Sequence, residues 1–381
     1  MNNLYNTFQE LIEIPSITRN KEEKEIVGFT EEKLKKIVES NENLSWVKIT
    51  IEKIENIDNN WIYHWGVICN IKADENYKNI WLMGHLDVVP VSKNWNTNPF
   101  KLVEENDRFL WRWTCDMKSW DAIMIEMLRE SLKNKPTKNI TLIFTSWEEK
   151  WIPNWLTEII NSKQIWNLDF AIALEPTNWK INTWVFWYLD SKFNFKWKAC
   201  HSSNPSLWEN AISKAWPFLT YLHSPDCIEA YDIYNTKLNE AFSATKIEWW
   251  IASNIIPDKA VIQTNLRYSP NRNWEEAEKL MRDLAKKYQA EKIEIIEHNP
   301  SSQIVRSDNL HLLEFIEKIK ASIQDLNVVP FWSDISQTSK LWIPSINFWP
   351  WSIEQAHTDN EFILKNSFEK TYKQFKNYLF N

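Results

Sequence analysis

The chain of 381 residues contains only three glycines, whereas ordinary usage of about 7% would give roughly 27. Glycine permits tight turns and close backbone approach, so a chain that almost lacks it needs an explanation. The sequence contains 25 tryptophans instead, and the two counts together restore the expected number. The shortage of glycine and the excess of tryptophan are therefore treated as one observation.

Several tryptophans stand where turns are expected, at 249–250, at 349 and 351, and at 111 and 113, where a loop opens. We hypothesise that most of them are glycines in the native protein. This follows if the codon UGA, read as tryptophan in this translation, is read as glycine by the source organism. The alternative is a chain that is tryptophan-rich in nature or by engineering. In a chain made as written, indoles at positions that require φ > 0 should harm folding and activity.

Other absences exclude whole classes of protein. No apolar run approaches the length of a membrane span. The four cysteines are too few and too scattered for a disulfide framework. The net charge of −7 and the lack of a basic stripe argue against a nucleic-acid partner. Residues 1–6 are polar and show no signal-peptide core, so we expect a soluble cytoplasmic protein with no membrane partner.

Hydrophobic periodicity predicts an α/β fold. Residues 4–12 and 21–40 have helical spacing, and residues 47–54 and 65–71 read as strands. Further apolar strands are expected at 80–83, 140–145 and 170–174, and a helix at 122–133.

Acidic residues or histidine follow each of the last three strands. His85 and Asp87 come after the first, Glu148 and Glu149 after the second, and Glu175 after the third. In open α/β sheets the chemistry usually lies at the carboxyl ends of strands. Asp116 stands before the helix at 122–133, and His357 lies in a late loop. These residues form the candidate site.

The pattern of predicted helices and strands changes near residue 184. Strand-like stretches, at 184–189, 193–199, 246–251 and 260–268, flank two helical patterns, at 210–222 and 274–288, in the order β-α-β-β-α-β. The α/β pattern resumes after residue 300, with a helix at 309–323, a strand at 345–348 and a terminal helix at 367–379. We therefore expect a catalytic domain formed by 1–183 and 296–381, interrupted by a ferredoxin-like domain at 184–295.

The candidate residues fit a site for two metal ions. Two ions about 3.5–4 Å apart can activate one water, which requires a bridging carboxylate and further histidine and carboxylate ligands. Oxygen and imidazole ligands suit Zn²⁺, and also Co²⁺ or Mn²⁺. Glu148 and Glu149 can supply one ligand and one general base. The carboxylate of Asp87 can accept the second ring N–H of His85 and fix its tautomer.

Each residue alone has a plainer explanation. A single carboxylate in a loop is usually a solvated charge, and His298 and His311 read as structural. Asp116 could be a helix N-cap, and Cys115 could be proposed as a nucleophile, although the carboxylates nearby favour a metal. Only the ordered set is specific.

The set resembles the co-catalytic zinc metallopeptidase and deacylase family, which includes aminoacylase, acetylornithine deacetylase and succinyl-diaminopimelate desuccinylase. Residues 84–90, Gly-His-Leu-Asp-Val-Val-Pro, resemble its first metal motif. Residues 111–120 resemble its second, usually Gly-Arg-Gly-Thr-x-Asp-Met-Lys-x-Gly, with tryptophan at three glycine positions. The resemblance implies that His85 and Glu175 bind one metal and that Glu149 and His357 bind the other. Asp116 would bridge the two ions, and Glu148 would be the base.

The inserted domain resembles the lid of the desuccinylase branch, through residues 200–203, 209–212, 252–258 and 265–268. In such enzymes the lid pairs two subunits, so the resemblance implies a homodimer. His201 would help to hold the oxyanion, and Asn254 would reach the partner's site. Arg267 would pair with a substrate carboxylate. Asn254 could instead be a turn residue, and Arg267 could form a surface ion pair. Ser333 lies in a stretch that only loosely matches the family's substrate-binding segment.

These features predict metal-assisted hydrolysis of an N-acyl amino acid. The resemblance favours N-succinyl-LL-2,6-diaminopimelate, in lysine and diaminopimelate biosynthesis. The nearest alternative is a sibling deacylase, a carboxypeptidase or a dipeptidase. A non-catalytic binding protein that kept the fold is the alternative from another class.

Overall fold

The computed structural model describes most of the chain in two compact units. The described residues are 1–18, 20–41, 46–57, 63–90, 101–110, 114–146, 148–149, 168–203, 210–227, 230–233, 236–249, 252–269, 272–299, 305–329, 333–339, 341–351, 354–356, 358 and 361–381. One unit comprises 1–184, 303–326 and 333–381, and the other comprises 185–302 and 327–332. The sequence placed the inserted domain at 184–295, without the segment 327–332.

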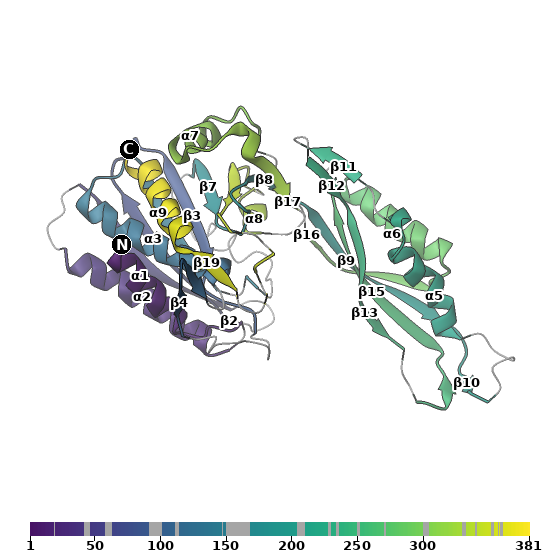
Figure 1. Ribbon diagram of the computed structural model, residues 1–381. Helices are drawn as coiled ribbons and strands as arrows, with labels where there is room; N and C mark the ends of the chain where they lie inside the picture. The colour runs from purple at the N-terminus through teal and green to yellow at the C-terminus, as the bar shows by residue number, and fades with distance from the viewer. Residues whose placement is uncertain are drawn as a thin grey trace. The chain divides into compact units, whose positions relative to one another are not determined.

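An eight-stranded mixed sheet lies mainly in the first unit and has the order β1-β2-β6-β3-β7-β18-β8-β17 (Figure 1). Its strands are β1 (Lys48–Ile57), β2 (Tyr63–Lys72), β3 (Asn79–His85), β6 (Asn139–Thr145), β7 (Phe170–Ala173), β8 (Ile181–Val185), β17 (Leu326–Val329) and β18 (Ser345–Phe348). β3 lies between β6 and β7 and runs parallel to both. Every residue of β6 and β7 is buried, as expected for strands that are covered on both faces.

Helices cover this sheet with their apolar faces. They are α1 (Asn2–Ile12), α2 (Glu22–Glu39), α3 (Ser119–Lys133), α7 (Leu310–Ile319), α8 (Ile335–Ser339) and α9 (Lys365–Phe380). Phe375 of α9 packs against Trp120 of α3, with ring centroids 4.4 Å apart, and against Phe315 of α7 at 5.8 Å. Phe8 of α1 packs on Phe368 of α9 at 5.1 Å. These contacts form one aromatic core that fixes α3, and with it the loop that precedes α3.

A small antiparallel sheet joins the late chain to that loop. It has the order β19-β5-β4, formed by Phe362–Leu364, Arg108–Leu110 and Val103–Glu105. In its register Phe362 is opposite Leu110. Four residues after β5, the short kinked turn η1 (Thr114–Lys118) leads directly into α3. The peptide between Asp116 and Met117 in this turn is cis.

The second unit has the ferredoxin-like arrangement. Its four strands, β9 (Trp187–Lys196), β13 (Ala241–Glu248), β15 (Lys259–Tyr268) and β16 (Lys292–Asn299), form an antiparallel sheet in the order β13-β15-β9-β16. Helices α5 (Ala211–Leu222) and α6 (Trp274–Lys287) contribute Phe218 and Met281 to its buried core. Short ribbons are formed by β10 (Cys200–His201) with β14 (Ile255–Ile256) and by β11 (Ala230–Ile233) with β12 (Thr236–Asn239), and a 3₁₀ turn by Pro225–Cys227. Another 3₁₀ turn, Ile323–Asp325, belongs to the first unit.

The α/β fold predicted from the sequence is confirmed, and the differences are local. The stretches 184–189 and 193–199, read as two strands, are instead the end of β8 and one continuous strand, β9. The 4-residue strand β17 and the ribbons were not expected, because they are too short to show a periodic pattern. Among the described residues, no helix is both long and apolar enough to span a membrane.

Two tryptophans have backbone conformations that normally belong to glycine. Trp179 has φ 64° and Trp342 has φ 62°, and both fall in the left-handed region. A bulky side chain is an outlier there, because its Cβ crowds the following carbonyl oxygen. Trp342 is 79% exposed, so packing of its ring does not offset this cost. Both positions support the hypothesis that tryptophan replaces native glycine.

Candidate metal centre

His85 is the last residue of β3, and its ring is buried at the carboxyl edge of the sheet. Nδ1 lies 2.9 Å from the main-chain oxygen of Asp87. Since a carbonyl oxygen can only accept, Nδ1 carries the proton and donates, which leaves the lone pair of Nε2 for another partner. The sequence assigned this bond to the Asp87 carboxylate, but Oδ1 lies 3.7 Å from Nδ1. The main chain of Asp87, and not its carboxylate, therefore orients the imidazole.

The partner of Nε2 is Asp116, in turn η1. Oδ1 of Asp116 lies 3.0 Å from Nε2 of His85, and both side chains are buried. Two acceptors at this distance require a proton or a cation shared between them. Two ligand atoms that bind one Zn²⁺ at about 2.0–2.2 Å lie roughly 3 Å apart, so the pair fits a common metal ion.

Glu175, after β7, completes a group of three. One ligand atom each from His85, Asp116 and Glu175 lies within 4.8 Å of the others, and all three residues are buried. Burial raises the pKa of Glu175 well above its usual value, and the charge of Asp116 adds to this effect. Burial lowers the pKa of His85, but the hydrogen bond to Asp116 and the nearby carboxylates raise it well above its usual value. A divalent cation would relieve this concentration of negative charge.

The carboxylate of Asp87 holds the two glutamates that follow β6. Oδ1 accepts the backbone N–H of Glu148 at 3.1 Å, and Oδ2 accepts that of Glu149 at 3.2 Å. Thr18 donates its hydroxyl to Oδ2 at 3.0 Å. Asp87 is fully buried, so its three partners fix it, and it in turn fixes the Glu148–Glu149 backbone.

The Glu148 carboxylate points back toward the histidine. Its Oε2 lies 3.9 Å from Nε2 of His85, and its side chain keeps 13% of its surface exposed. Burial and the charge of Glu175 raise the pKa of Glu148 well above its usual value. A carboxyl with a raised pKa, beside a ligand group and open to solvent, can accept and return a proton near neutral pH.

Sequence and structure comparisons identify the class of hydrolase. A family model described as Peptidase family M20/M25/M40 matches residues 81–381. The chain belongs to this family. It is therefore a metal-dependent hydrolase, and its buried His85, Asp116 and Glu175 can hold a divalent ion.

The M20 chain is similar to named relatives and solved structures over most of its length. Succinyl-diaminopimelate desuccinylase of Rickettsia bellii is 26% identical over 325 residues, covering 79% of this chain and 81% of the relative. A tripeptidase from Staphylococcus aureus has the same fold, with TM-score 0.75, 18% identity and coverage of 99% and 97%. An M20 metallo-carboxypeptidase from Sulfolobus solfataricus gives TM-score 0.77 and 18% identity, covering 99% of this chain and 98% of that one.

Some of the other residues discussed for the centre of this M20 hydrolase lie outside the described residues, and others are fully buried. His357, the second histidine ligand expected, lies outside the described residues, as do residues 111–113 and 147. Cys115 is fully buried, and burial raises the pKa of its thiol well above its usual value, which argues against a nucleophile. Ser333 is also fully buried and donates its hydroxyl to Oδ1 of Asn347 at 2.9 Å.

Asp334, next to Ser333, was not singled out from the sequence. It is buried, and burial raises its pKa to about 6. After burial and nearer charges, the charge of Asp334 also contributes to the raised pKa values of Glu148 and Glu175. The substrate-binding role expected for Ser333 stays a prediction.

Lys118 and Asp121 form a second layer behind His85. The ammonium group of Lys118 is buried and donates to the main-chain oxygens of Leu11 and Ile14, which ties η1 to the end of α1. Asp121 lies so close to β3 that a Cβ on Gly84 would meet its Oδ1 at 2.7 Å. A larger residue at position 84 would therefore require the Asp121 side chain to move. Lys118 belongs to the motif at 111–120 noted from the sequence, whereas Asp121 lies just outside it and reads as an ordinary charge at a helix start.

In the second unit, His201 and Asn254 are neighbours. The backbone N–H of Ser202 donates to the main-chain oxygen of Asn254, where the β10–β14 ribbon begins. Both residues are exposed. Nδ1 of His201 accepts the backbone N–H of Ser203 at 3.3 Å, which leaves Nε2–H as a donor directed elsewhere. Asn254 lies in a turn, which agrees with the plainer explanation that it is a turn residue.

Arg267, on β15, is half-buried and forms no ion pair with the residues that the structure describes. Its guanidinium lies 4.8 Å from the ring centroid of Tyr188, and Nε donates to Asn265 at 2.9 Å. Nη1 is buried and has no hydrogen-bond partner in the described part of the chain. A buried guanidinium N–H without a partner is a position for an anionic group of a ligand.

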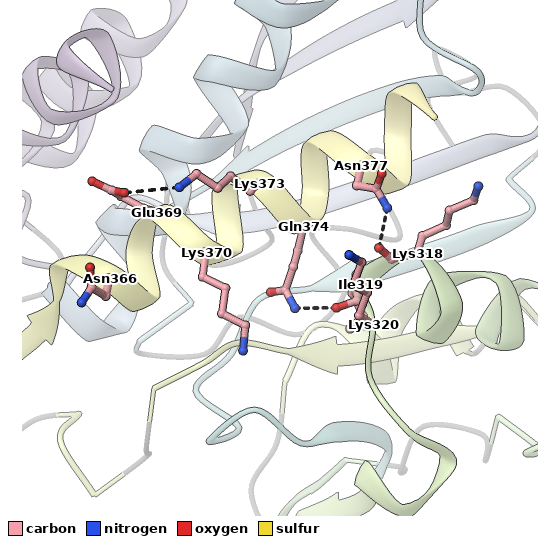
Figure 2. A pocket seen from close by; sticks show the side chains of 9 residues that line it. All are labelled: Lys318, Ile319, Lys320, Asn366, Glu369, Lys370, Lys373, Gln374 and Asn377. Carbon is pink, nitrogen blue, oxygen red and sulfur yellow. Dashed lines mark hydrogen bonds and ion pairs between the residues drawn. The ribbon is translucent and has the colours of Figure 1, made fainter.

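A separate cavity of about 510 Å³ lies between the end of α7 and α9 (Figure 2). Lys318, Lys320, Lys370 and Lys373 line it, together with Glu369, which pairs with Lys373 at 3.5 Å. Amide groups of Gln374 and Asn377 donate to the main-chain oxygens of Ile319 and Lys318 and so cap α7. The cavity contains none of the candidate site residues, and its polar groups join two helices.

Proposed function

We propose that this M20 hydrolase removes the succinyl group from N-succinyl-LL-2,6-diaminopimelate, a step in lysine and diaminopimelate biosynthesis. The observation that carries the catalytic part is the buried group of His85, Asp116 and Glu175. Asp87 places Glu148 beside this group. The named activity of the R. bellii relative, and the likeness of the second unit's sequence to a desuccinylase lid, favour the succinyl substrate.

In this proposal the chain binds two divalent ions, most simply zinc. His85 and Glu175 would hold one, Glu149 and His357 the other, and Asp116 would bridge them. The ions would supply Lewis-acid polarisation of the amide carbonyl and would increase the acidity of the attacking water.

Glu148 carries the proton chemistry. Its carboxylate takes a proton from the attacking water and returns it to the nitrogen of the leaving amine, so that succinate and free diaminopimelate result. Asp87 keeps the Glu148 backbone in place through its Oδ1. Burial, and then the charges of Glu175 and Asp334, hold the pKa of Glu148 high, which suits a group that must both accept and donate.

Recognition is assigned to the second unit. Arg267 offers the buried N–H groups that a substrate carboxylate requires. His201, with Nε2–H as donor, would stabilise the oxyanion, and Asn254 would bind beside it. Both are exposed in the single chain, in keeping with a homodimer in which they reach the partner's centre.

Metal content and a substrate panel test this proposal. We would measure zinc by mass spectrometry, and hydrolysis of N-succinyl-LL-diaminopimelate, N-acetylornithine and a dipeptide. Two preparations are compared, the chain as written and a version with glycine at the suspect tryptophans. Two bound ions and preferred desuccinylation support the proposal. Brisk deacetylation or dipeptide cleavage without desuccinylation would reassign the substrate, and absence of both metal and activity would favour a binding protein.

A further inference from the structure

Glu361 is a buried acidic residue that neither the sequence pattern nor the proposed ligand set uses. It lies immediately before β19 and is 1% exposed. Its Oε1 accepts the backbone N–H of Cys115 at 2.5 Å and that of Asp116 at 3.3 Å. A single carboxylate oxygen thus binds two consecutive amides at the start of the turn that carries Asp116.

Those amides need a partner from elsewhere in the chain. A buried backbone N–H without an acceptor is costly. Asp116 has φ −128° and ψ 93°, outside the helical region, so regular helical hydrogen bonding is interrupted at this turn, and Glu361 accepts both amides. A carboxylate is a stronger acceptor than a neutral group.

The position of Glu361 is itself fixed from both sides. The next residue, Phe362, pairs with Leu110 in the β19–β5 ladder. Phe109 and Phe368 flank this ladder with ring centroids 6.4 Å apart in the core. The side chain therefore reaches η1 from a strand that cannot easily shift. Glu361 lies four residues after His357 in the sequence. Its hydrogen bonds therefore link the segment of the proposed ligand His357 to the turn that carries the proposed ligand Asp116.

We propose that Glu361 is a positioning residue for Asp116. It holds the 115–116 backbone so that the Asp116 carboxylate is presented to the metal ions. This rests on the proposed role of Asp116 as the bridging ligand. Partners of this kind, which orient a ligand without touching the metal, typically change metal affinity or activity by 10–100-fold when removed.

The test compares Glu361→Ala, Glu361→Gln and the control Glu130→Gln. Glu130 is a buried carboxylate of α3 that pairs with Lys376 at 2.7 Å and takes no part in the centre. Three quantities are measured on each full-length protein: hydrogen exchange of the 115 and 116 amides, the dissociation constant for Zn²⁺, and the absorption spectrum of the Co²⁺-loaded form. Where hydrolysis is measurable, kcat and KM are added.

We expect Glu361→Ala to lose protection at both amides, to bind Zn²⁺ about 10–100-fold more weakly and to show a changed Co²⁺ spectrum. KM should stay within about twofold while kcat falls. Glu361→Gln keeps one acceptor oxygen and should recover most of the affinity, and Glu130→Gln should leave all these readouts unchanged. If the alanine variant folds poorly, the test of the positioning role rests on Glu361→Gln and on hydrogen exchange of its 115 and 116 amides.

Unchanged metal affinity and spectrum in Glu361→Ala, with the amides exposed, would overturn the positioning role. Unchanged exchange would overturn the contact itself. Failure of the proposed function is read separately, from the wild-type protein, which would then bind no zinc even though its 115 and 116 amides are protected.

Discussion

Oδ1 of Asp87 accepts the backbone N–H of Glu148 at 3.1 Å, although the sequence suggested that this carboxylate serves His85. The carboxylate is fully buried and, within the described part of the chain, it accepts hydrogen bonds from Thr18, Glu148 and Glu149. Its role is therefore to hold the backbone that carries the proposed base and the adjacent ligand. The imidazole of His85 is oriented by the main chain of Asp87 and would keep that contact in a side-chain variant.

Replacing Asp87 by asparagine separates these two roles. The amide NH₂ of asparagine would face one of the two backbone N–H groups, so one of the glutamates loses its acceptor. We expect kcat to fall by about 10–100-fold, while Zn²⁺ at the His85 side is retained. Steady-state kinetics and zinc titration check this. Loss of both ions with the fold intact would mean that Asp87 acts on His85 after all.

Replacing Glu148 by glutamine should remove the proton carrier and leave the metal in place. Glutamine has a similar shape, but it cannot take up a proton from water. We expect kcat to fall by about 10²–10⁴-fold at unchanged zinc content. Measurement of kcat and of zinc content on the same preparation tests this expectation. A variant with wild-type kcat would exclude Glu148 as the base.

The main elements of the site could be predicted from the sequence because they follow long apolar strands. β3, β6 and β7 were each visible as apolar runs, and parallel neighbours bring their carboxyl ends to one edge. The residues that orient them could not be predicted in this way. Glu361 meets Cys115 across 246 positions, and Thr18 meets Asp87 across 69. Such contacts depend on tertiary packing, which leaves no periodic signal in the chain.

Acidic pH should stabilise the metal-free protein. Burial raises the pKa of Asp334 to about 6, and also raises the pKa values of Asp87, Glu148 and Glu175. The folded state therefore binds these protons more tightly than the unfolded chain. Their contribution to stability is complete below the unfolded pKa values and is lost as the pH rises through the folded ones.

Thermal unfolding of the chelated protein tests this. We expect Tm to be several degrees higher at about pH 5 than at about pH 6.5, a range below the pKa of about 7 to which burial lowers Lys118. Saturating Zn²⁺ should reverse the trend, because a cation replaces the protons. Asp334→Asn should reduce the difference. A metal-free Tm that rises steadily over this range would contradict the argument.

Arg267→Lys should weaken binding of a substrate with a free carboxylate. Lysine keeps the charge but offers neither the fork of two N–H groups nor the planar contact with Tyr188. We expect KM to rise about tenfold or more with a smaller change in kcat. Comparison with a substrate that lacks this carboxylate supplies the control. An equal effect on both substrates would show that Arg267 only stabilises the structure of the second unit.

Trp342→Gly tests the glycine hypothesis where other effects are smallest. The residue has φ 62° and is 79% exposed, so the substitution relieves the strained backbone and removes almost no packing. We expect the free energy of unfolding to rise by about 1 kcal/mol. Trp216→Gly is the matched control, because that tryptophan is 64% exposed but lies inside helix α5. Glycine there should lower stability by up to about 1 kcal/mol. If both variants were destabilised alike in chemical unfolding, position 342 would have no preference for glycine. A rise at 342 with a fall at 216 would instead show that the fold itself distinguishes a glycine position from a helical one.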